Sequence, residues 1–300
     1  MKARARLVAF LVAVPLSGVS AQGVYYEGGL SLASGNYIFT ERTNTITLLT
    51  GLALQAGPVT LRATLPAYFQ NTTLLAGSSA GLVPTGGSSS TAVADSAASR
   101  GGRGGRSGTT SPVPSVSFSS AAVLDDSLGS VEVPVSSVTG YGASVGDPTV
   151  GLTASVLRSS RVGVLVSVGA KVPVTDTSSY GTGAWDVGGS VSLSCGLGRT
   201  TMIGVDVAYW SMGDAPGLEL QNSLMTSVSI SHLTFSGWGF SASAFRASPV
   251  IDGFPSSASA GAGIVHMGAR GSVGLNATVG LTETAPDVMI GLSWRVGLGR

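Results

Sequence analysis

The sequence predicts an all-β protein: a transmembrane antiparallel β-barrel of about 12 strands in the outer membrane of a Gram-negative bacterium. Runs of about ten residues that alternate apolar with small or polar side chains recur from Arg161 to Gly299. This period of two indicates strands whose two faces meet different solvents. Only 10% of the residues are charged, yet outside the N-terminus no apolar run reaches the roughly 18 residues of a membrane helix. Only a closed barrel places such strands in lipid without an unpaired backbone edge.

The N-terminus is typical of a secretory signal peptide, which we expect to cover residues 1–21. Basic residues precede a short apolar core, Leu7–Leu16, and small residues ending at Ala21 form the expected cleavage site. Residues 22–300 are then a single barrel domain. The lone Cys195 excludes an intramolecular disulfide.

The order of strands and connections supports the same fold. The expected strands cover 24–33, 44–56, 58–69, 147–157, 161–173, 184–197, 200–211, 219–232, 237–246, 257–267, 269–281 and 287–298. Short and long connections alternate between them, as short periplasmic turns and longer external loops do in outer-membrane barrels.

The longest connection, residues 70–146, is predicted to be a flexible external loop. Its centre, Ser99–Gly108, is rich in glycine, arginine and serine. Part of this loop could fold into the barrel mouth and narrow it. The run lacks the aromatic residues that stack nucleic-acid bases, so we expect no nucleic-acid partner.

The strand phase assigns charged side chains to the inner face. A charge facing lipid at mid-depth would cost about 2–4 kcal/mol. The residues predicted to line the lumen or a constriction are Glu27, Arg62, Lys171, Asp186, Asp206, Arg270 and Arg295. Because both signs occur, the lumen should be polar and mixed. Lys171 and Asp186 lie on either side of one external loop and could pair, either as a structural contact or as part of a constriction.

Nothing in the sequence indicates catalysis. The two histidines, His232 and His266, fall near periplasmic turns, away from an outer-leaflet substrate, and neither begins the His-x-Ser spacing of barrel deacylases. Cysteine and histidine do not cluster as in zinc sites, and no calcium loop occurs. We therefore expect no enzyme and no catalytic, cofactor or metal site.

Three motifs resemble one known family. Gly146–Leu152 opens a strand with Gly-Asp, Lys171–Asp176 ends one with a Lys-x-Pro pattern, and Gly181–Asp186 carries Gly-Thr-Gly-x-x-Asp. The chain is similar to the meta-pathway phenol-degradation family of outer-membrane proteins. That resemblance implies passage of aromatic or other apolar compounds. The chain departs from the family pattern in its Gly/Arg-rich insertion, and it lacks the usual terminal aromatic of barrel assembly signals.

Taken together, these features favour a porin-like channel or transporter. Small molecules, including apolar or aromatic ones, would cross the lumen by passive or selective diffusion. The alternative is a non-conducting structural or surface-interaction barrel, because a barrel filled by its own side chains conducts nothing. The expected partners are outer-membrane lipid, the barrel-assembly machinery and a small-molecule solute. A secreted soluble β-sandwich is a more remote alternative.

Overall fold

The computed structural model describes residues 23–87, 93, 94, 96, 141–159, 161–175 and 180–299. Twelve long strands form the barrel: β1 Gly23–Gly35, β2 Thr43–Ala56, β3 Val59–Gln70, β7 Thr149–Arg158, β8 Val162–Lys171, β9 Asp186–Gly196, β10 Thr201–Ser211, β11 Ser223–Leu233, β12 Trp238–Ala247, β13 Ser257–Gly268, β14 Gly271–Gly280 and β15 Val288–Gly297. Each pairs antiparallel with the next in this order, and β15 pairs back on β1, which closes the ring. The predicted transmembrane β-barrel is confirmed.

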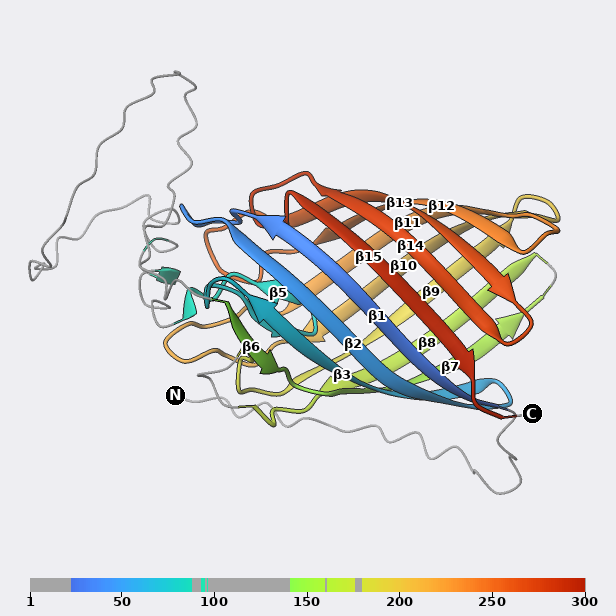
Figure 1. Ribbon diagram of the computed structural model, residues 1–300, viewed down its shortest axis with the longest axis horizontal. Helices are drawn as coiled ribbons and strands as arrows, with labels where there is room; N and C mark the ends of the chain where they lie inside the picture. Colours follow the sequence, from blue (N-terminus) through green and yellow to red (C-terminus); the bar gives the residue numbers. More distant parts are fainter. Residues whose placement is uncertain are drawn as a thin grey trace, which may run out of the picture.

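The strands run obliquely around the barrel (Figure 1). Their exposed outer face is apolar. In β9, Val191 and Leu193 point outward and are 43% and 49% exposed, while Ser190 and Ser192 point inward. Such exposure would be costly in water but suits lipid. The alternation of apolar and small polar side chains therefore follows from two environments, lipid outside the barrel and the lumen inside it.

The two ends of the barrel differ in their connections. We call the end with short turns the periplasmic end and the end with long connections the external end, following outer-membrane barrels. Predicted and observed strand bounds agree within two residues except for β11, which was predicted from 219 and begins at Ser223. Residues 1–21 and Ser99–Gly108, which carry the signal-peptide and flexible-loop predictions, lie outside the described residues.

The described part of the connection between β3 and β7 holds three short strands, which the sequence did not predict. Strands β4 (Ala76–Ser78) and β5 (Gly81–Val83) form a hairpin, and β6 (Gly142–Val145) pairs with the external end of β3. Figure 1 shows β5 at the external end of the barrel. Within the described residues, no helix has the length and apolarity to cross a membrane.

The buried apolar core lies in the external loops. Its members are Tyr37, Ile38, Phe39, Leu74, Leu75, Val83, Val93, Met212, Ala215, Leu218, Leu220, Ile251 and Phe254. The β1–β2 and β10–β11 connections that contribute to it lie on opposite sides of the twelve-strand ring. The cluster therefore spans the external mouth, and we call it the external cap.

Candidate functional site

The lumen wall is built mainly of small side chains. Inward positions are dominated by glycine, serine, threonine and alanine, as along β9 and β13. Two hollows of about 390 and 360 Å³ lie along this wall. Ser78, at the tip of the β4–β5 hairpin, lines both hollows. The hairpin thus covers the external side of the lumen, which is otherwise wide.

Backbone contacts hold the hairpin in the mouth. The Gly77 amide donates to the Tyr180 carbonyl over 2.6 Å, and the two glycines Gly77 and Gly181 form a parallel bridge. A Cβ atom at Gly77 would overlap the Tyr68 hydroxyl on the inner face of β3. A larger residue at this position would require the Tyr68 side chain to move.

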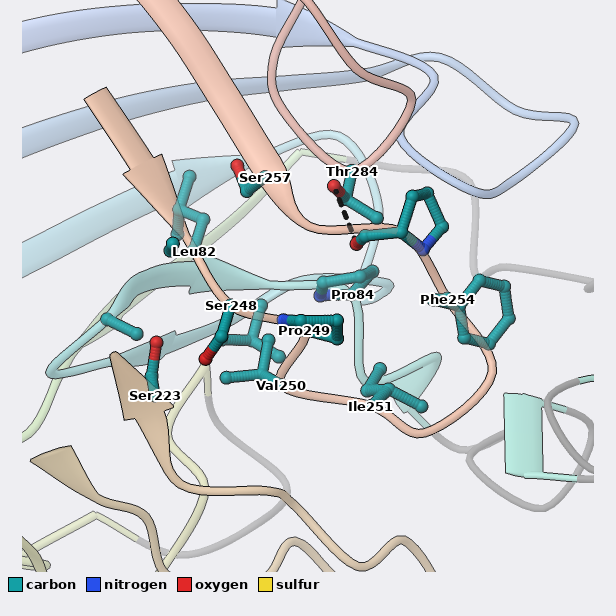
Figure 2. A pocket seen from close by; sticks show the side chains of 14 residues that line it. Leu82, Pro84, Ser223, Ser248, Pro249, Val250, Ile251, Phe254, Ser257 and Thr284 are labelled. Atoms are coloured by element: carbon teal, nitrogen blue, oxygen red, sulfur yellow. Dashed lines mark hydrogen bonds between the residues drawn. The ribbon is translucent and has the colours of Figure 1, made fainter. Parts of the chain in front are cut away.

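A small apolar cavity lies inside the cap. Figure 2 shows Leu82 and Pro84 of the hairpin facing Val250, Ile251 and Phe254 of the β12–β13 loop. The cavity volume is about 40 Å³, room for only a few water molecules. An aromatic ring would enter it only if the loops moved apart. The cap is therefore an apolar barrier across the external mouth.

A buried charged cluster joins the cap to the barrel. The Lys171 ammonium lies 3.1 Å from Asp147 Oδ2 and 3.7 Å from Asp186 Oδ2, and it donates to Thr182 Oγ1 over 2.6 Å. The three charged side chains are 2% exposed or less. Two carboxylates surround one ammonium, so further donors must satisfy the excess negative charge.

Backbone amides of the external loops supply most of those donors. Asp186 accepts hydrogen bonds from the Ser79 amide and the Gly213 amide, each over 3.0 Å. Asp147 accepts from the Val174 amide, and from the amide and hydroxyl of Thr175. The Asp186 carboxylate thereby ties the β4–β5 hairpin and the β10–β11 loop to the same point on the barrel rim.

Acidification is expected to loosen this junction. Burial raises the pKa of Asp147, but hydrogen bonds from Thr175 and Lys171 outweigh burial and leave the pKa below its usual value. A carboxyl group with a lowered pKa contributes stability above its unfolded pKa and loses it as the pH falls through the folded value. We expect hydrogen exchange of the Val174 and Thr175 amides, which donate to Asp147, to be constant from about pH 7 to 5 and to accelerate below 3.8, after correction for intrinsic rates. Peptides from the strand β13 should not respond, and an equal response in Asp147→Asn would contradict the assignment.

The other predicted charged residues lie closer to the periplasmic end. Glu27 forms an ion pair with Arg62, whose Nε lies 2.6 Å from Glu27 Oε2 and whose Nη2 donates to Glu27 Oε1 over 3.3 Å. Arg295 Nε lies 3.4 Å from the same carboxylate. Asp206, on a distant strand, accepts from the Ser227 hydroxyl over 3.2 Å. Arg270 follows the inward phase at the β13–β14 turn and lines a wide periplasmic hollow with Arg295.

The predicted lumen residues thus fall into two groups, one at the external rim of the barrel and one closer to its periplasmic end. Lys171 and Asp186 make the contact expected from the sequence, but they are buried beneath the cap and do not line the open lumen. Sequence reasoning missed Asp147, although its Gly-Asp motif was noticed. All three family-like motifs meet at this cluster. Among the described residues, no three Asp, Glu, His or Cys side chains gather as a metal site requires.

No family model and no curated protein matches this sequence. Solved structures do match. The COG4313 outer membrane channel from Pseudomonas putida F1 has a TM-score of 0.59 at 11% identity, over 93% of this chain and 97% of that chain. The CymD monoaromatic hydrocarbon channel has a TM-score of 0.44 at 10% identity, over 94% of this chain and 90% of that one. The P. putida toluene transporter TodX scores 0.41 at 12% identity, over 94% and 91%. The first of these likenesses shows a shared barrel fold.

Proposed function

We propose that the protein is an outer-membrane channel through which small apolar molecules, aromatic ones included, diffuse toward the periplasm. The observation that carries this proposal is the contrast between the two ends of the barrel. The lumen is roomy and lined by small side chains, whereas its external mouth is filled by apolar loop residues. A solute that enters through such a cap must itself tolerate an apolar environment.

The shared fold with an outer membrane channel from P. putida F1 supports this proposal. The lumen wall supports it further, because a barrel meant to be solid would need large inward side chains to fill a twelve-strand ring. Inward residues such as Gly151, Ser167 and Ser190 instead line open space. Among the described residues, the cap is what closes this path, so the path requires local opening of the cap.

Uptake of radiolabelled toluene by cells with and without the protein tests the channel directly. We expect faster uptake with the protein, and a severalfold reduction when Ser190, which lines a lumen hollow, is replaced with tryptophan. The matched control is Val191→Trp, because Val191 is the next residue on β9 and faces outward, 43% exposed. An indole on that face meets lipid and should leave uptake unchanged.

The alternative is a non-conducting surface barrel, which the cap also favours because it spans the whole mouth. Equal toluene uptake with and without well-folded protein would establish that alternative. A variant Ser190→Trp that transports as well as the parent would likewise exclude a path through the lumen.

A further inference from the structure

A wide hollow of the described barrel lies at its periplasmic end, away from the cap. Its volume is about 760 Å³, and Tyr25, Gln55, Met267, Arg270 and Arg295 contribute to its wall. We call it the periplasmic vestibule. Its lining combines guanidinium and amide donors with the apolar surface of an aromatic ring and a thioether.

The two arginines of the vestibule lie on neighbouring parts of the barrel, Arg270 in the β13–β14 turn and Arg295 on β15. The Arg270 carbonyl accepts from the Gly297 amide over 2.8 Å, and Ser272 pairs in register with Arg295. Arg295 is held in place, because its guanidinium lies 4.0 Å from the centroid of the Tyr25 ring and its Nε 3.4 Å from Glu27. Arg270 is exposed, and its side chain makes no ion pair or hydrogen bond with the described residues.

The charge balance around the vestibule is strongly positive. The described charged side chains near this end are Arg62, Arg158, Arg161, Arg199, Arg270, Arg295 and Glu27. Glu27 lies between Arg62 and Arg295 and compensates only part of their charge. Two further arginines, Arg161 and Arg199, line a separate hollow across the barrel, at the β7–β8 and β9–β10 turns. A ring of arginines at a pore opening attracts anions.

We propose that the periplasmic vestibule binds small organic carboxylates. Arg270 and the exposed part of Arg295 would hold the carboxylate, because guanidinium groups match carboxylate geometry. Met267 and the ring of Tyr25 would contact the apolar body of the ligand. The site goes beyond passage of neutral solutes, and its place on a transport path rests on the proposed function. A solute that carries both an apolar body and a carboxylate would then be retained at the periplasmic exit.

Calorimetric titration of the folded barrel in a nonionic detergent at low salt tests this site without requiring transport. The probe is sodium benzoate. We expect saturable binding by the parent protein, and affinity lowered about tenfold in Arg270→Gln. The matched control is Arg42→Gln, which removes an exposed arginine at the external end and should leave benzoate affinity unchanged. Low salt keeps the arginine field from being screened.

The neutral analogue benzyl alcohol and inorganic phosphate separate the two parts of the site. Saturable binding of benzyl alcohol as tight as that of benzoate would overturn the role of the arginines. Phosphate that binds as tightly as benzoate would overturn the apolar part. Unchanged benzoate affinity in Arg270→Gln would overturn the site itself. Benzoate binding by a barrel that fails to transport toluene would instead refute the proposed function and leave this site intact.

Discussion

Replacing Lys171 with methionine is expected to release the external cap from the barrel rim, at a cost of about 3–5 kcal/mol. Lys171 is 2% exposed and neutralises Asp147 and Asp186, which are at most 1% exposed. Without the ammonium, two carboxylates remain buried side by side. They keep their amide and hydroxyl donors but lose their only cation among the described residues. Hydrogen exchange of the Ser79 and Gly213 segments should accelerate, since these segments are bound to Asp186.

A matched control separates the effect of burial from the effect of removing a positive charge. Arg42 and Asp287 form an external ion pair of 2.8 Å, but their side chains are 54% and 53% exposed. Arg42→Met should therefore cost no more than about 1 kcal/mol. Equal effects of Arg42→Met and Lys171→Met would contradict the argument from burial.

The double variant Lys171→Met with Asp147→Asn tests whether the charges act together. Asparagine keeps an oxygen that can accept from the Thr175 amide and hydroxyl, and it removes one of the two negative charges. The two substitutions should therefore cost less together than the sum of the single costs, because contacting residues are not independent. Strict additivity would show that the Lys171 ammonium does not stabilise the Asp147 carboxylate.

The barrel strands could be predicted because each alternates between two solvents, and that signal is local. The error at β11 has the same origin. Leu218 and Leu220 continue the alternation before Ser223, so the strand was predicted to begin at 219. Both leucines are buried in the cap, and the Gln221 amide donates to the Val250 carbonyl of a neighbouring loop. Apolar side chains spaced by two can therefore face a loop core as well as lipid.

The cap itself could not be derived from periodicity. Its residues come from loops without a regular repeat, and its contacts are distant in sequence: Ser79 and Asp186 are 107 residues apart. The sequence nevertheless contains a weaker indication of the cap. Tyr37-Ile38-Phe39 and Leu74-Leu75 are apolar runs in segments expected to be solvated. Such runs in external loops indicate that the loops pack together, because exposing them to water would be unfavourable.

Deleting the part of the cap that lies between β3 and β7 is expected to change the ion conductance of the channel. The parent protein should conduct little, and the deletion should show large, steady conductance steps in a planar bilayer. In the deletion that we propose, a short flexible linker joins Asn71 to Tyr141, which removes the β4–β5 hairpin and Val93 while leaving β6 on β3. The lumen below the hairpin is already roomy, with hollows of 390 and 360 Å³. Water and ions would then fill a lumen whose wall is built of glycine, serine and threonine. The ion conductance should therefore rise severalfold.

A shorter deletion decides which part of the connection closes the channel. Removing only 97–140 keeps Leu74, Leu75, Val83 and Val93 in the cap, so conductance should stay low. Large steps in the parent protein would mean that the packed loops do not block ions. If the longer deletion shows no conductance steps although its barrel is folded, the inner wall closes the lumen without the hairpin. The small inward side chains favour ions in the lumen, whereas the buried apolar cap excludes them. The difference between the two deletions therefore measures the contribution of residues 72–96 to the cap.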